Sequence, residues 1–109
     1  MPWTLKKDAA LGSVVVVFTG RLTKEEGEAS AHAFREAVES EPTNVEWDLR
    51  QMTGYDSGAR TAWQKHLWPV RDKLQSVRVV GGNGLVRLGA TTLGLALGIP
   101  ISFADDEPT

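Results

Sequence analysis

Cysteine is absent from the 109 residues, and this absence excludes several kinds of site at once. Without thiols the chain cannot form disulfides, bind zinc through thiolates or use a cysteine nucleophile. Histidine is also scarce, with only His32 and His66, so a metal centre built on imidazole ligands is not expected. The sequence therefore predicts neither a metal site nor a cofactor.

A long hydrophobic run and a cluster of basic residues are also missing. The longest apolar stretch, LVRLGATTLGLALGIPI, contains Arg87 and Pro100, so it is too short and too interrupted to span a membrane. The N-terminal MPWTLKKD has no apolar run of signal-peptide length. The 12 Lys and Arg residues are scattered among 14 Asp and Glu, whereas nucleic-acid binding favours a basic stripe. We expect a soluble cytoplasmic protein that contacts neither membrane nor nucleic acid.

What is present fits one small globular domain. A chain of 109 residues with 41% apolar residues is long enough for a single core and too short for two. We therefore predict one domain over residues 1–109. Its core spans about 12–103, and the acidic ADDEPT at 104–109 reads as a frayed tail.

Strand and helix signals alternate along the first half of the chain. WTLKK (3–7) and the β-branched run VVVVFTG (14–20) predict the two strands of a hairpin. The second of these shows no polar alternation, so both its faces are expected to be buried. Thr23 and Glu26 fit a capping box at the start of a helix over about 24–39. NVEWDLR (44–50) predicts the next strand, followed by a loop over QMTGYD (51–56).

The second half continues the alternation. A helix is expected to begin near Ser57, and Pro69 must either kink it or restart it. SVRVV (76–80), LVRLGATTLGLALG (85–98) and IPISF (99–103) predict a strand, a third helix and a last short strand. The order ββαβαβαβ indicates an α/β fold class: a single domain with a mixed four- to five-stranded sheet and helices packed mainly on one face.

Three short motifs are spaced as in a known family. GRLT (20–23) precedes the first helix, Asp48-Leu49 ends a predicted strand, and Asp56-Ser57 starts the second helix. In these motifs and their spacing the sequence resembles the STAS family, the domain of anti-sigma-factor antagonists and sulfate-transporter tails, over about residues 12–103. Two positions depart from the family pattern. Gly58 stands where the family has a second hydroxyl residue, and Arg60 where it has an aliphatic one.

The resemblance implies a STAS-like fold and a non-enzymatic role in bacterial signalling through protein–protein contact. It implies a protein partner, often an anti-sigma factor that is itself a serine kinase. Ser57 would be the phosphate acceptor, with Tyr55, Asp56, Gly58 and Arg60 as its neighbours. The chemistry of a helix start agrees, because its unpaired amides and partial positive charge tolerate a phosphate. In the plainer interpretation, Asp56 and Ser57 only cap the helix.

The third predicted helix is apolar over more of its circumference than one sheet face can cover. Leu85, Leu88 and Leu95 extend the apolar surface beyond the expected core stripe. Trp68 is expected to point away from the core if the second helix is straight. These four residues are candidates for partner binding. Two alternatives stay open: neighbouring elements cover the excess, or a second copy does so in a homodimer or larger assembly.

Two further patterns carry less weight. Ser57 and His66 are nine positions apart on one helix, about 13 Å along its axis, which is too far for a hydrolase pair, so an enzyme is not expected. VVGGNGLVR follows a strand as phosphate-binding loops do, but it lacks the complete glycine fingerprint and any Gly-Lys-Ser/Thr. A tight turn explains it better. A small-ligand or nucleotide pocket between GGNG and the TGYDS segment remains an alternative function.

Overall fold

A computed structural model of the chain describes residues 2–8 and 10–104. The elements alternate as predicted, with one 3-10 helix (η1) added between α2 and β4. In chain order they are β1 (Trp3–Asp8), β2 (Ser13–Leu22), α1 (Lys24–Val38), β3 (Thr43–Tyr55), α2 (Ser57–Leu67), η1 (Trp68–Lys73), β4 (Leu74–Val80), α3 (Gly84–Leu97) and β5 (Ile101–Ala104). Most of the predicted acidic tail, residues 105–109, lies outside the described residues.

Five strands form one mixed sheet in the order β1-β2-β3-β4-β5. β1 and β2 make the predicted antiparallel hairpin, and β2 to β5 each run parallel to the next. The register places Val14 opposite Val45, and Val45 opposite Val77, so aliphatic side chains line up across one face. The α/β fold class and the mixed sheet are thus confirmed.

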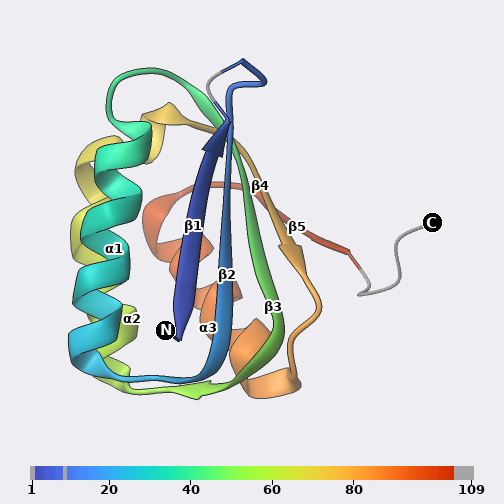
Figure 1. The fold of residues 1–109 in the computed structure, drawn as a ribbon. Helices are drawn as coiled ribbons and strands as arrows, with labels where there is room; N and C mark the ends of the chain where they lie inside the picture. The colour runs from blue at the N-terminus through green and yellow to red at the C-terminus, as the bar shows by residue number, and fades with distance from the viewer. Residues whose placement is uncertain (1, 9, 105–109) are drawn as a thin grey trace.

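The helices α1, α2 and α3 pack on that same face (Figure 1), as predicted. Between sheet and helices lies one apolar core with an aromatic centre. Trp47 of β3 meets Trp63 of α2 edge to face, with ring centroids 5.5 Å apart, and Phe34 of α1 lies 5.2 Å from Trp63. Such offset and perpendicular contacts add to the stability that burial of the rings already provides.

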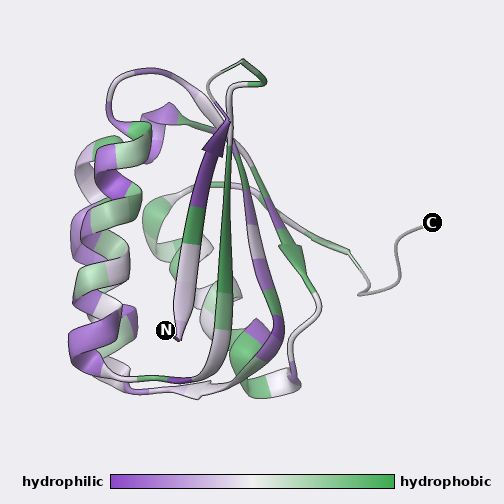
Figure 2. Cartoon of the chain, viewed as in Figure 1, coloured by the Kyte–Doolittle hydropathy of each residue, from purple (hydrophilic) through white to green (hydrophobic). Residues whose placement is uncertain are grey.

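The other face of the sheet differs from the prediction for residues 14–20. Val14, Val16 and Phe18 are buried, whereas Val15 and Val17 are only half-buried and Thr19 is exposed. The prediction of two buried faces was wrong because the described helices all cover one side, which leaves the alternate residues of β2 on an open face. Figure 2 shows hydrophobic colouring over much of β2, and the unbroken valine run behind it is why the sequence pattern gave no alternation.

The helices α1 and α2 pack side by side at very short range. The predicted capping box is present: the Glu26 amide donates to Thr23 Oγ1 at 3.3 Å, and the Thr23 amide donates to Glu26 Oε1 at 3.0 Å. One turn further on, a Cβ on Gly27 would lie only 2.5 Å from both Cα and Cβ of Ala59 in α2. Glycine at this position therefore sets how closely the two helices approach.

β3 is longer than predicted, and this corrects the expected loop at 51–56. The strand continues to Tyr55, where it pairs with Leu22 of β2 and no longer with β4. The pairing with β2 shifts register twice, because β3 holds two extra residues there. Such bulges bend a strand. In Figure 1 the ends of β2 and β3 bend together away from β4 and run toward the starts of α1 and α2.

The first bulge lies next to Asp48, which the motif comparison placed at a strand end. Asp48 is buried and is instead the last residue of β3 that pairs with β4. Its carboxylate accepts hydrogen bonds from the Arg50 amide at 3.1 Å, from Nε at 3.0 Å and from Nη2 at 2.6 Å. The side-chain bonds of Arg50, more than its charge, hold the pKa of Asp48 below its ordinary value of 3.8 despite burial.

Pro69 restarts the chain after α2 and does not kink it. α2 ends at Leu67, and Pro69 lies in the first turn of η1, where a missing amide costs nothing. α3 ends at Leu97 and is capped by Gly98, whose φ of 69° places it in the left-handed region that favours glycine. Pro100 then leads into β5, the edge strand beside β4.

Candidate functional site

Ser57 is exposed at the tip of a helix, as the motif comparison predicted. It is the first residue of α2 and follows Asp56, which has extended backbone dihedrals of −78° and 147°. The Ser57 carbonyl accepts a hydrogen bond from Thr61 Oγ1 at 3.1 Å. Within residues 2–8 and 10–104, the Ser57 hydroxyl has no hydrogen-bond partner of its own. The hydroxyl is therefore open to solvent at a helix N-terminus.

The role of Asp56 differs from the simple cap that the sequence suggested. Asp56 occupies the N-cap position of α2, but its carboxylate makes no capping bond to that helix. Oδ2 instead accepts from the amide of Lys24, the first residue of α1, at 3.2 Å. Oδ1 accepts from Arg21 Nε at 3.0 Å and Nη2 at 2.7 Å. The expectation that Asp56 and Ser57 cap their own helix was wrong for both side chains.

Three other predicted neighbours lie around Ser57 and serve packing. Tyr55 ends β3, and its ring lies against Gly89 of α3, where an added Cβ would be 2.6 Å from the phenol oxygen. Gly58 faces the aliphatic stem of Lys24, with Cγ 2.9 Å from the position of a missing Cβ. Arg60 is half-buried and reaches from α2 toward α3. The residues around Ser57 therefore lie together at the junction of β3, α2 and α3.

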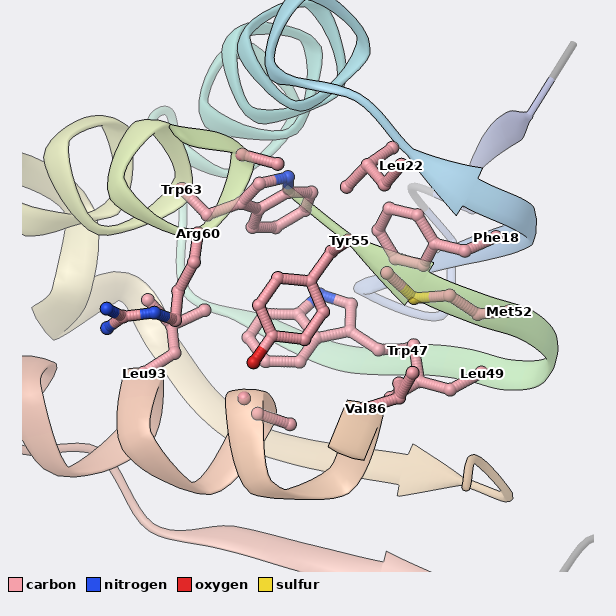
Figure 3. A pocket seen from close by; sticks show the side chains of 13 residues that line it. Phe18, Leu22, Trp47, Leu49, Met52, Tyr55, Arg60, Trp63, Val86 and Leu93 are labelled. Atoms are coloured by element: carbon pink, nitrogen blue, oxygen red, sulfur yellow. The ribbon is translucent and has the colours of Figure 1, made fainter. Parts of the chain in front are cut away.

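Below this junction lies a cavity of about 70 Å³ (Figure 3). The residues that line it were not identified as a group from the sequence. Its floor is the curved end of β3, and α2 and α3 form its sides. Arg60 is the one charged residue among the described residues that line it; the others are Phe18, Leu22, Trp47, Leu49, Met52, Tyr55, Ala59, Trp63, Val86, Gly89, Ala90 and Leu93. The aromatic residues of the wall come from β2, β3 and α2, and only spatial proximity identifies them as a group.

The GGNG segment forms the turn that positions α3. Gly81 and Gly82 have φ of 69° and 98°, which other residues rarely adopt. Asn83 caps α3 by accepting from the Val86 amide at 2.9 Å, and its Nδ2 donates to the Thr53 carbonyl at 3.2 Å. The two glycines are thus explained by turn geometry, and the asparagine ties α3 to β3.

The four predicted partner-binding residues are all exposed. Leu85, Leu88 and Leu95 have 58%, 61% and 80% of their surface accessible, and Trp68 has 50%. The Arg71 guanidinium carbon lies 3.8 Å from the ring centroid of Trp68, a cation–π contact that orients the ring. Neighbouring elements of the described chain therefore do not cover the excess apolar surface of α3.

The two histidines, distant in sequence, are neighbours across α1 and α2. His66 is buried, and its Nε2 lies 2.6 Å from Glu28 Oε1, a hydrogen bond that lowers the pKa of the Glu28 carboxyl. The ring of His32 lies edge to face with that of His66, 5.9 Å between centroids. Among the described residues, no group of three or more metal-binding side chains converges here or elsewhere.

Comparison with known proteins identifies the fold of the chain through solved structures. No family model matches the chain, and no curated protein matches it in sequence. A solved structure of an uncharacterized protein of the DUF3478 family from Shewanella loihica PV-4, described as having a SpoIIAA-like fold, is similar with a TM-score of 0.68 and 14% identity. The match covers 94% of this chain and 83% of that one.

The second similar structure is SpoIIAA itself, described as an anti-sigma factor antagonist in its unphosphorylated form. Its TM-score is 0.57 at 15% identity, over 98% of this chain and 89% of that one. In the described residues, no helix combines the length and apolar content needed to span a membrane. The similarity to these two solved structures shows that the chain has the STAS-like, SpoIIAA-like fold that the motif spacing predicted.

Proposed function

We propose that this chain is a protein-recognition module whose partner docks at the start of α2, and that phosphorylation of Ser57 releases the partner. The exposed, unengaged hydroxyl of Ser57 at a helix N-terminus is the observation that supports this most directly. The fold shared with SpoIIAA suggests the class of partner, an anti-sigma factor with serine kinase activity in the bacterial cytoplasm. On this proposal the domain performs no catalysis.

The charges around Ser57 make a phosphate effective as a switch. A phosphoserine adds about 1.5 to 2 negative charges next to Asp56, and the two anions repel each other. The side chain of Arg21, which pairs with Asp56, is 61% exposed, so a phosphate on Ser57 would compete with Asp56 for this guanidinium. Phosphorylation would therefore alter both the surface charge and the contact that ties α2 to the end of β2.

The experiment compares three variants of Ser57, two of which differ from each other only in charge. Ser57→Asp adds the charge, Ser57→Asn has the same shape without the charge, and Ser57→Ala removes the hydroxyl. Each is used as bait in a lysate of the source organism, and the protein retained by the wild type is then purified and titrated calorimetrically. We expect Ser57→Asp to weaken binding by about tenfold or more, because the charge would be buried unpaired in the interface.

Ser57→Asn and Ser57→Ala should bind the same partner like the wild type. Equal affinities of Ser57→Asp and Ser57→Asn would refute the switch, even if the surface is still a docking site. If the partner is a serine kinase, its incubation with ATP and the wild type should phosphorylate Ser57 and no other residue. Mass spectrometry of the Ser57→Ala variant should then find no phosphate.

A second candidate function is favoured by the apolar face of α3. Exposed leucines at 85, 88 and 95 give an assembly subunit a surface for a second copy, with Ser57 never modified. Light scattering on a sizing column separates the candidates. A stable oligomer whose mass is unchanged in Ser57→Asp supports the assembly role, whereas a monomer supports the switch.

A further inference from the structure

The cavity beneath Tyr55 has the features of a small binding site. Its volume of about 70 Å³ is roughly five times the space that one water molecule needs. It is far smaller than a drug-sized or nucleotide pocket, so it suits a single ring or a short chain. Its walls are aromatic and aliphatic, and an apolar cavity of this kind tends to stay dry and to accept apolar groups.

A buried donor without a partner lies in the wall of this cavity. The indole Nε1 of Trp47 is buried, and the residue is 3% exposed, yet Nε1 has no hydrogen-bond partner among the described residues. Trp63, its neighbour, does donate, to Ser30 Oγ at 3.0 Å. Nε1 itself is closed off from the cavity space, so Trp47 contributes its ring to the wall, and its indole N–H signal can report on that wall without bonding a ligand.

Among the described residues that line the cavity, the single charged side chain is positive. Arg60 lines the opening, and Figure 3 shows its stem passing from α2 toward Leu93 of α3 with the guanidinium turned outward. No acidic residue is among the described residues that line the cavity. This is also a position where the STAS pattern has an aliphatic residue. A guanidinium at the mouth of an apolar cavity favours a ligand with an anionic head, and its planar fork fits a carboxylate.

We propose that the cavity binds a small apolar monocarboxylate, with the carboxylate at Arg60 and the ring or chain between Trp47, Trp63 and Leu93. The ring of Tyr55 reaches from β3 to Gly89 of α3 and forms part of the cavity wall. This inference goes beyond the switch proposed at Ser57 and does not depend on it.

The test uses three probes that share one phenyl body: phenylacetate, 2-phenylethanol and phenethylamine. Binding is followed by two-dimensional ¹H–¹⁵N NMR on the wild type, with the indole resonance of Trp47 assigned from a Trp47→Phe variant. We expect phenylacetate to shift the Trp47 indole and Gly89 amide resonances saturably, with a dissociation constant below about 1 mM. The alcohol and the amine should bind at least about fivefold more weakly.

Two variants show whether Arg60 is responsible. Arg60→Gln should weaken the binding of phenylacetate by about fivefold and leave the binding of 2-phenylethanol unchanged, because only the charged pair is lost. Lys65→Gln removes an exposed cation from the same helix and should change neither affinity. The proposal is overturned if phenylacetate gives no saturable shift at 10 mM, a concentration about tenfold above the expected constant. It is also overturned if the three probes bind alike and Arg60→Gln has no effect, since the cavity would then be a simple void.

Discussion

The carboxylate of Asp56 and the backbone amide of Lys24 are joined by a hydrogen bond of 3.2 Å, although the two residues flank different helices. Asp56 stands before α2, and Lys24 begins α1. The same carboxylate holds Arg21 at 2.7 Å, near the end of β2. One acidic side chain therefore ties together two helix starts and a strand end, directly beside the proposed phosphate acceptor.

Removing this carboxylate should destabilise the domain measurably. Asp56→Ala loses the bond to the Lys24 amide and the pair with Arg21, and we expect the free energy of unfolding to fall by about 1 kcal/mol. Asp56→Asn keeps an oxygen that can accept from the Lys24 amide. Its free energy of unfolding should therefore lie between those of Asp56→Ala and the wild type. Urea unfolding followed by tryptophan fluorescence measures both. Ser57→Ala is the neighbouring control and should unfold like the wild type; equal stability of Asp56→Ala and wild type would contradict the proposed tie.

Substitution of Gly27 tests the close approach of α1 and α2. In Gly27→Ala the new methyl group meets the backbone of Ala59 at 2.5 Å, and backbone cannot rotate away. We expect a loss of about 1–3 kcal/mol from overpacking, more than the gain in helix propensity that alanine brings. Gly84→Ala is the matched control, because its Cβ would meet nothing within 4 Å. Chemical unfolding should show that variant unchanged or slightly more stable.

Most of the fold was predictable because its signals are local. The Thr23 and Glu26 capping box and the proline after α2 each act within a few residues, and each is found where expected. Alternation of strands and helices then leaves few ways to arrange a parallel sheet.

The errors concern features that depend on distant neighbours. Residues 51–55 read as a loop because Gly54 and polar residues interrupt the pattern, yet pairing with β2 keeps them in a strand. Asp56 has the residue type of a helix cap, but the amide it binds belongs to α1, 32 positions away. The cavity likewise needs the bend in β3, which follows from bulges that no single segment encodes.

The Asp48–Arg50 contact predicts a change of stability in acid. The folded-state pKa of Asp48 lies below 3.8, so the stability that its ionised carboxylate contributes is complete above about pH 5 and is lost as the pH falls through the lowered pKa. Asp48→Asn should cost about 1–2 kcal/mol at neutral pH. Between about pH 5 and pH 2.5 the variant should lose less stability than the wild type.

Urea unfolding at several pH values measures both slopes. The Glu28–His66 pair acts in the same direction, because the pKa of Glu28 is also lowered, but it is present in both proteins and cancels in the difference. Parallel pH profiles of Asp48→Asn and wild type would show that Arg50 does not hold the carboxylate in solution.

The exposed face of α3 predicts that stability and binding respond to different leucines. Leu95 is 80% exposed, so Leu95→Ser should change the free energy of unfolding by less than about 0.5 kcal/mol. Leu93, two positions away on the same helix, is 7% exposed, and Leu93→Ser should cost about 2–5 kcal/mol. If α3 contributes to the proposed docking surface, Leu95→Ser should fold normally but should bind the partner captured by the wild type more weakly. Unchanged partner affinity together with a dimer that Leu95→Ser dissociates would assign this face to a second copy of the chain.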